Sequence, residues 1–306
     1  MLGIVLGTEQ GILELIPGSE PERPVSGIRV TSLDYRDGVA VAAAAGEGVW
    51  VHDGRRWEQR WEGEPSCVRV APDGRLYAGT EGAGLWLSDD RGETWSEIQG
   101  MRNVVRHNNF HAPAGHAAPY VAGVAFPKEG ILVAVAGGGA WFTRDDGQSW
   151  LERGDGIDHA LHTMREHPEQ RDRVFASAES GFYRSDDGGF SWVQSIGGLD
   201  RSWGGSLAVM PGSPDTLLFA AANRSDGGGG ALFRSANGGV SWKWVDLGED
   251  SLGDWDHLPV VARVWDSEDT AFAAGGGRVW GTHDAGRSWL ELADGLPTPL
   301  AITAAL

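Results

Sequence analysis

Six of the nine histidines in this 306-residue chain fall in or beside polar segments that separate apolar runs. The first and longest of these segments spans about residues 98–120. The six histidines are His107, His111, His116, His159, His162 and His257. Imidazoles grouped with Asp, Arg and Trp in this way suit metal binding, acid–base chemistry or recognition of a polar ligand.

One interpretation is a metal centre built on His107-x3-His111-x4-His116, with His162 or His257 contributed by other segments. Neutral imidazoles bind zinc, copper or iron, and the spacing does not separate these metals. In a catalytic version, His107, His111 and His162 would hold the metal or act as acid and base.

That catalytic version gives roles to three further side chains. Arg201 would neutralise developing negative charge, and Asp254 or Asp256 would orient a histidine. The reaction would be of the hydrolase or lyase type.

A second interpretation is a site for a polar small molecule, sugar or peptide, in which tryptophans supply flat contact surfaces and carboxylates accept hydroxyl groups. The predicted ligand-binding residues are Glu81, Arg106, Asn109, Asp158, Glu179, Trp203 and Trp255. A third interpretation is a solvated set of loops whose histidines cap turns. A fourth is a non-catalytic scaffold that engages a protein partner through the same loops.

A repeated segment indicates how these loops are positioned. It has the form Ser/Thr-x-Asp-x-Gly-x-Ser/Thr-Trp and occurs at residues 88–95, 143–150, 185–192, 235–242 and 282–289. In the fourth copy Asn237 replaces the aspartate. Successive copies are 42 to 55 residues apart, the length of one four-stranded propeller blade. The carboxylate can accept hydrogen bonds from its own turn, and the glycine permits a positive φ.

The motif resembles the Asp-box (BNR) repeat of sialidases, Vps10-type receptors, some glycoside hydrolases and photosystem II assembly factors, over roughly residues 67–292. The resemblance implies a β-propeller in which the boxes are structural turns. A true sialidase would also carry an Arg-Ile-Pro motif near its start, which this sequence lacks. The assembly factors imply a basic patch, which a chain this acidic does not obviously offer.

Counting apolar runs extends the pattern beyond the boxes. Residues 27–61 form a further blade, and Leu300–Leu306 can pair beside Met1–Leu6 to complete another. We therefore predict an all-β, seven-bladed propeller of four-stranded antiparallel blades, a single domain over residues 1–306. Six blades, with the N-terminal segment outside them, is the alternative.

In such a blade the Asp boxes and the first turn share one end, so the polar segments lie at the opposite end, where we expect function. The charged run at residues 166–173 falls in a first turn and is predicted to be solvated.

Composition limits the partners. With 43 acidic and 25 basic residues the formal charge is −18, which argues against nucleic acid and anionic membrane surfaces. The opening residues do not resemble a signal peptide. The only cysteine, Cys67, lies in an apolar run and is predicted to be buried. We expect a cytoplasmic protein.

Overall fold

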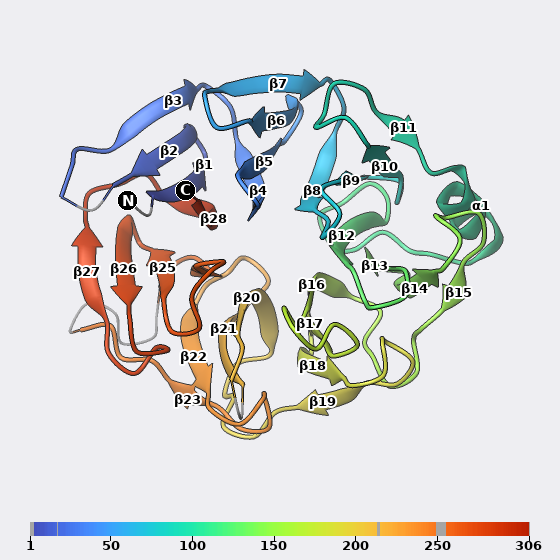
Figure 1. The fold of residues 1–306 in the computed structure, drawn as a ribbon. Helices are drawn as coiled ribbons and strands as arrows, with labels where there is room; N and C mark the ends of the chain where they lie inside the picture. Colours follow the sequence, from blue (N-terminus) through green and yellow to red (C-terminus); the bar gives the residue numbers. More distant parts are fainter. Residues whose placement is uncertain (1–2, 17, 213–214, 249–254, 306) are drawn as a thin grey trace. The chain divides into compact units, whose positions relative to one another are not determined.

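The computed structural model describes residues 3–16, 18–212, 215–248 and 255–305. These residues form seven sheets of four antiparallel strands, so the protein is a seven-bladed β-propeller (Figure 1). The predicted fold class is confirmed, and the six-bladed alternative is wrong.

Four consecutive blades follow the chain in order. Their strands are β4 (Val30–Arg36), β5 (Val39–Ala44), β6 (Gly48–His52) and β7 (Trp57–Trp61); β8 (Pro65–Val70), β9 (Leu76–Thr80), β10 (Leu85–Ser88) and β11 (Ser96–Glu97); β12 (Tyr120–Ala125), β13 (Ile131–Ala136), β14 (Gly139–Thr143) and β15 (Leu151–Glu152); β16 (Leu161–Glu166), β17 (Val174–Ala178), β18 (Gly181–Ser185) and β19 (Val193–Ser195).

The other three blades complete the set. Their strands are β20 (Trp203–Met210), β21 (Thr216–Ala222), β22 (Ala231–Ser235) and β23 (Lys243–Trp244); β24 (Val260–Arg263), β25 (Ala271–Gly275), β26 (Arg278–Thr282) and β27 (Leu290–Ala293); β28 (Pro299–Ala305), β1 (Gly3–Thr8), β2 (Gly11–Leu15) and β3 (Glu22–Ser26).

The last of these blades joins the two ends of the described chain. Strand β1 lies between β28 and β2, and Leu6 is paired with Ile302 on one side and Leu13 on the other. The predicted pairing of the C-terminal strand beside the N-terminal one is confirmed.

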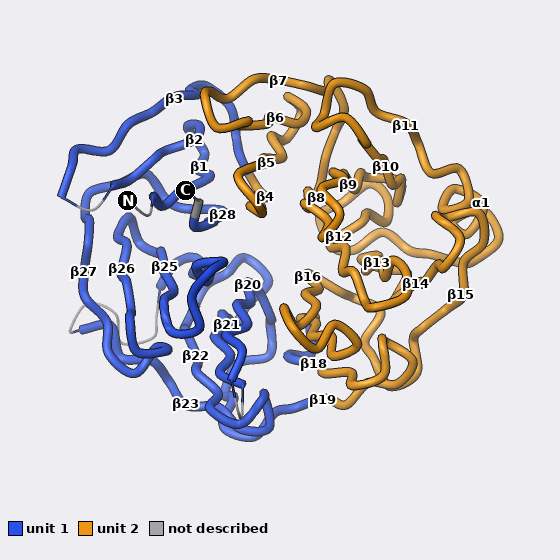
Figure 2. Tube along the Cα trace, viewed as in Figure 1, with its two compact units in different colours: residues 1–30, 179–182, 195–306 blue, residues 31–178, 183–194 orange. Residues whose placement is uncertain are grey.

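The chain divides into two compact units (Figure 2). Unit 1 comprises residues 1–30, 179–182 and 195–306, and unit 2 comprises residues 31–178 and 183–194. The assignment of all 306 residues to one domain stays a prediction.

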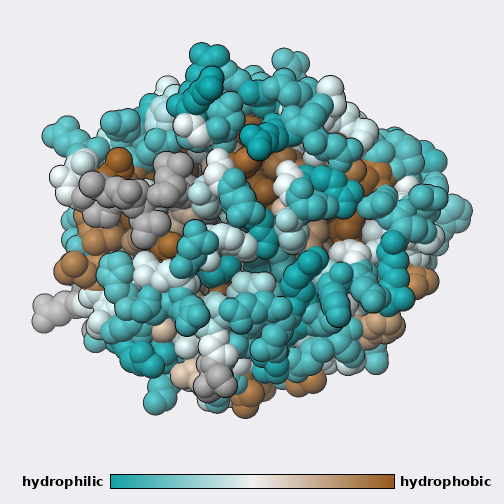
Figure 3. Space-filling view, in the orientation of Figure 1, coloured by the Kyte–Doolittle hydropathy of each residue, from teal (hydrophilic) through white to brown (hydrophobic). Residues whose placement is uncertain are grey.

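Inner strands such as β5 and β13 are continuous apolar runs in which every residue is buried. Both faces of such a strand pack against neighbouring side chains, so the alternation of polar and apolar residues disappears. Cys67 lies in this interior, as predicted, and burial raises the pKa of its thiol to about 11. Figure 3 shows a face covered mostly by hydrophilic side chains, with hydrophobic ones in separate patches.

Each Asp box is a self-contained hydrogen-bonded turn. In the second box, the Asp145 carboxylate accepts the backbone N–H of Ser149 at 2.9 Å, the Ser149 hydroxyl at 2.6 Å and the Thr143 hydroxyl at 2.7 Å. These donors, the Ser149 hydroxyl foremost, lower the pKa of Asp145 to about 2. In the fourth box, Asn237 Oδ1 accepts the Ser235 hydroxyl and the Ser241 backbone N–H in the same way, but its amide N–H donates to the Ser241 hydroxyl.

The box glycine is required for two reasons. Gly189 has a φ of +89°, and a Cβ there would lie 2.7 Å from Leu132 of the preceding blade. The residue before it also has positive φ in every box, and in one box that position is Ala285, with φ 57°. Each box thus has two consecutive positions with positive φ. Only the later one, Gly189 in the third box, needs glycine both for its backbone conformation and for the close packing between blades.

Buried charges join the first strands of four blades in unit 2. Arg69 on β8 donates to Asp34 on β4 at 3.0 Å, to Glu166 on β16 at 3.1 Å, and to the carbonyl of Val124 on β12. Arg36 lies 3.9 Å from the other Glu166 oxygen. We call Asp34, Arg36, Arg69 and Glu166 the ion network.

Burial alone would raise the pKa of Glu166, but Arg69, Arg36 and Arg165 together hold it below its ordinary value. The prediction that the charges of residues 166–173 are solvated is wrong for Glu166 and for His167, which are 7% and 0% exposed. Glu166 is the last residue of a strand and belongs to the network, while the His167 ring accepts two backbone N–H groups of its own turn.

Helix α1 (Gln99–His107) occupies the start of the longest connection, where the sequence predicts only a loop. The helix has no side-chain cap at Ile98 and no acidic residue in its first turn, so it carries none of the usual sequence signals. No helix among the described residues is long and apolar enough to cross a membrane.

Candidate functional site

A groove of about 550 Å³ lies in unit 2, at the end of the blades opposite the Asp boxes. It is lined by the end of β7, the β9–β10 turn and one side of α1. The lining residues are Trp61, Gly63, Glu64, Thr80, Glu81, Gly82, Gly84, Trp86, Glu97, Arg102, Val105 and Arg106. We call this the tryptophan groove.

Helix α1 provides one wall because two of its apolar side chains anchor it. Met101 and Val104 are buried in the core between β8–β11 and β12–β15. Arg102, Val105 and Arg106, spaced by three and four residues, consequently line the groove. Arg102 is fixed by Glu97, whose carboxylate lies 2.7 Å from its guanidinium.

Two tryptophans form the apolar part of the groove. The rings of Trp61 and Trp86 are 4.9 Å apart, and Trp95 stacks on Trp61 at 5.6 Å. At Gly84 a Cβ would lie 3.6 Å from the indole nitrogen of Trp86 and 3.8 Å from a carboxylate oxygen of Glu97. The Cβ would also lie only 2.6 Å from the Thr80 hydroxyl, so a side chain at this position would clash there and cover the indole N–H of Trp86.

Two residues predicted to bind ligand, Glu81 and Arg106, are brought together in this groove. Glu81 also accepts the backbone N–H groups of Ala117 and Ala118 at 3.0 and 3.1 Å, which fixes the return of the long connection. These two hydrogen bonds hold the carboxylate in place at the wall of the groove.

The other predicted residues of unit 2 do not line the groove. His107 is exposed, and its Nδ1 lies 2.7 Å from the carbonyl of Asn103. The exposed ring of His116 lies tilted against the ring of Tyr120, with centroids 4.3 Å apart. Asp158 accepts the N–H of Ala160 in a turn. The remaining three are exposed Asn109 and His111 and half-buried His162.

Seven predicted residues fall in unit 1, and the structure describes six of them. Arg201 is buried, donates to the carbonyl of Gly229 at 2.9 Å and lies over the ring of Trp244. Trp255 is 9% exposed and stacks on Trp280. The others are half-buried Glu179 and Trp203 and exposed Asp256 and His257; Asp254 lies outside the described residues.

Within the described ranges, no group of three or more His, Cys, Asp or Glu side chains is arranged to hold a metal ion. The predicted metal ligands His107, His111, His116, His162 and His257 therefore gain no support from the geometry.

No protein-family model and no curated protein matches the sequence. Solved structures do match in fold. The GH74 xyloglucanase from Xanthomonas campestris has a TM-score of 0.66 and 15% identity over 87% of this chain and 45% of the enzyme. The chain thus spans less than half of that enzyme's length.

Two other matches have nearly the length of this chain. YCF48 bound to a D1 peptide has a TM-score of 0.61 and 17% identity, covering 92% of this chain and 89% of that one. A putative 6-phosphogluconolactonase from Bacteroides fragilis has a TM-score of 0.65 and 11% identity, covering 100% and 98%. The chain is a seven-bladed β-propeller similar to Asp-box propeller structures, and at these identities the likeness concerns the fold.

Proposed function

We propose that the protein binds a neutral, polyhydroxylated ligand, a short oligosaccharide, in the tryptophan groove. The observation that carries this proposal is the pairing of Trp61 and Trp86 with carboxylates and guanidiniums in one groove of about 550 Å³. Its volume lies within the usual range of small-molecule sites, roughly 300–1,000 Å³.

The charges of the groove favour a neutral ligand. Three glutamates (Glu64, Glu81 and Glu97) and two arginines (Arg102 and Arg106) line it, giving a formal charge of 2 − 3 = −1. A strongly charged ligand would meet repulsion from one set or the other, whereas sugar hydroxyl groups both donate and accept. Aromatic rings offer an apolar surface to the C–H face of a sugar.

The similar folds bear on the choice of ligand. One is that of a xyloglucanase, and another is that of a protein bound to a peptide. An extended peptide is the second candidate, favoured by the near-equal lengths of this chain and YCF48. The proposal concerns binding; the metal-assisted hydrolase or lyase activity and the cytoplasmic location stay predictions.

The test is binding of neutral oligosaccharides, xyloglucan fragments included, measured by isothermal titration calorimetry. Trp86→Ala should weaken binding at least tenfold, since stacking and a hydrogen-bond donor are both lost, or about 1.4 kcal/mol. Gly84→Val should have a similar effect by filling the space beside the indole nitrogen.

The matched control is Trp244→Ala, which removes a half-exposed tryptophan of unit 1 outside the groove. It should leave the affinity unchanged. Absence of binding by every oligosaccharide, or equal loss in the two tryptophan variants, would contradict the proposal. Binding of extended peptides instead, lost in Trp86→Ala, would establish the second candidate.

A further inference from the structure

One arginine beside the ion network has no acidic partner of its own. Arg165 on β16 directly precedes Glu166, and its side chain is half-buried. Among the described residues it makes one hydrogen bond, from Nη1 to the carbonyl of Met164 at 3.5 Å, and no ion pair. A guanidinium has five N–H donors, so four of those of Arg165 have no protein acceptor in the described chain.

Arg69, by contrast, uses all five of its donors. Its Nε donates to Asp34 at 3.0 Å, and its Nη2 donates to the two carboxylate oxygens of Glu166 at 3.1 and 3.2 Å. Its Nη1 donates to the carbonyls of Val124 and Met164. No N–H group of Arg69 is therefore left for a further ligand.

The two arginines lie next to each other. Both donate to the same carbonyl oxygen, that of Met164, at 3.3 Å from Arg69 and 3.5 Å from Arg165. Burial and, after it, the positive charge of Arg69 lower the pKa of Arg165 to about 10, against the opposing effect of Asp34 and Glu166. At neutral pH Arg165 therefore carries a positive charge that is partly removed from water and lies beside a like charge.

The charges around Arg165 do not balance. The ion network itself is neutral, with two arginines and two carboxylates, so adding Arg165 gives 3 − 2 = +1. Cys67 supplies no negative charge at neutral pH, because the pKa of its thiol is about 11. Asp37, which acts on Arg36, is exposed in the β4–β5 turn, where water screens its charge. A buried charge without a counter-charge costs free energy, so an anion bound here would stabilise the fold.

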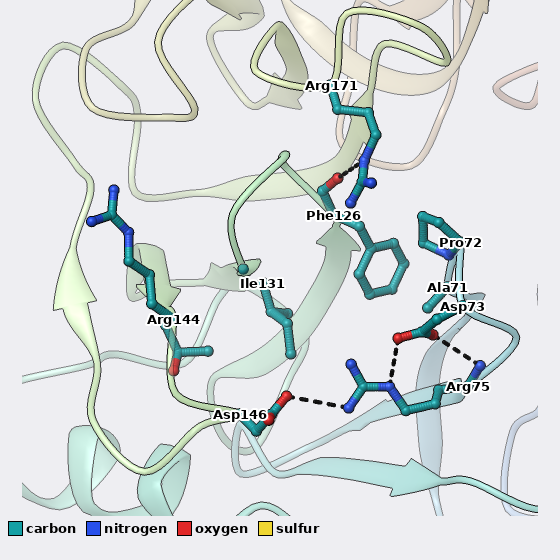
Figure 4. Close-up of a pocket in the computed structure, with 11 residues that line it drawn as sticks. Ala71, Pro72, Asp73, Arg75, Phe126, Ile131, Arg144, Asp146 and Arg171 are labelled. Carbon is teal, nitrogen blue, oxygen red and sulfur yellow. Dashed lines mark hydrogen bonds and ion pairs between the residues drawn. The ribbon is translucent and has the colours of Figure 1, made fainter.

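Other arginines of unit 2 have partners of their own. Figure 4 shows a cavity of about 410 Å³ in which Arg75 donates to Asp73 at 2.8 Å and to Asp146 at 3.2 Å. On another wall of this cavity, Arg171 donates to the carbonyl of Phe126 at 3.0 Å. These guanidiniums stand apart from one another, so they do not form a cluster like the one around Arg165.

We propose that Arg165 binds a monovalent inorganic anion, a halide of the size of chloride, beside the ion network. Guanidinium N–H groups bind anions through charge-assisted hydrogen bonds. A single negative charge balances the +1 of the group, whereas a dianion would be repelled more strongly by Asp34 and Glu166. No residue of the tryptophan groove takes part, so this proposal is independent of the proposed function.

The first test follows the line width of the chlorine NMR signal in sodium chloride solutions, with bromide as the competitor. Wild-type protein should broaden the signal, and bromide should reverse the broadening saturably in the millimolar range. Arg165→Met should remove most of the broadening, because methionine keeps an apolar stem but has no N–H donor. Arg165→Lys keeps a positive charge and three N–H donors, so it should retain part of the broadening.

A second measurement compares urea midpoints in sodium chloride and in sodium gluconate of equal ionic strength. For the wild type, chloride at about ten times its dissociation constant should lower the unfolding equilibrium constant roughly tenfold. Arg165→Met should show no such difference between the two salts. In gluconate this variant should be at least as stable as the wild type, since an uncompensated charge has been removed.

The matched control is Arg144→Met, which removes an arginine whose side chain is 59% exposed and lies 3.4 Å from Glu129. It should bind chloride like the wild type, as should Trp86→Ala in the tryptophan groove. Equal broadening by the wild type and Arg165→Met, or an equal loss in Arg144→Met, would overturn the proposal. If sulfate displaces chloride at a lower concentration than bromide does, the site takes a dianion and the assignment to a monovalent anion is wrong.

Discussion

The Asp boxes and the ion network stabilise carboxylates by opposite means. Asp145 is held at the surface by hydroxyl and N–H donors of its own turn, whereas Glu166 is buried and held by arginines up to 97 residues away. In both places the pKa lies below its ordinary value. The comparison shows that a local turn can be repeated from blade to blade, while a long-range contact is specific to one set of blades.

The largest difference should appear on neutralising Glu166. Glu166→Gln leaves Asp34 as the acidic group that Arg36, Arg69 and Arg165 still share, and should cost about 3 kcal/mol or more of unfolding free energy. Urea unfolding followed by circular dichroism measures it. The control Glu9→Gln removes an exposed carboxylate 2.9 Å from Arg29 and should cost less than about 1 kcal/mol. Equal losses of unfolding free energy in the two variants would mean that burial does not increase the contribution of Glu166 to stability.

An intermediate effect is expected from the adjacent glycines of the third box. Gly189→Ala should lower the unfolding free energy by about 2 kcal/mol, because strain at positive φ adds to a clash with Leu132. Gly188→Ala meets nothing closer than 3.8 Å and should cost about 1 kcal/mol or less. Urea midpoints of the two variants measure the packing between blades directly. If the two variants have the same urea midpoint, the box glycine is needed only for the conformation of the turn and not for packing between blades.

The smallest effect should come from the box aspartates. The lowered pKa of Asp145, about 2, means that its contribution is complete above about pH 3.8, its unfolded-state value, and is lost as the pH falls through about 2. The urea midpoint of Asp145→Asn should therefore approach that of the wild type between pH 5 and pH 2. The reverse variant Asn237→Asp should gain the same pH dependence. A constant difference across this range would show that the carboxylate charge is irrelevant to the turn.

The sequence allowed prediction of those features of the fold that repeat from blade to blade. Five boxes and the apolar runs between them indicated seven blades, and even the pairing of β28 with β1 followed from counting strands. Contacts without a repeat were not predicted. Glu166 was assigned to a solvated run because nothing in its neighbourhood shows that Arg69 reaches it across three blades.

Only part of the candidate site could be predicted, because the contacts that form the groove do not repeat from blade to blade. Glu81 and Arg106 were among the predicted ligand-binding residues because both lie at the end of the blades opposite the boxes, and both line the groove; that they bind a ligand stays a prediction. Trp61 and Trp86 were not among the predicted site residues, since tryptophans in strands resemble core residues. Nothing in the sequence showed that Gly84 leaves the indole nitrogen of Trp86 uncovered.

The pairing of β1 with β28 also has a consequence for biosynthesis. Strand β1 leaves the ribosome before the other strands of the propeller, whereas its partner β28 is the last of them to be made. Until then β1 presents an unpaired edge that can recruit strands of other nascent chains. The entropic cost of joining such distant segments grows only with the logarithm of their separation, so the final pairing completes the sheet without a prohibitive penalty.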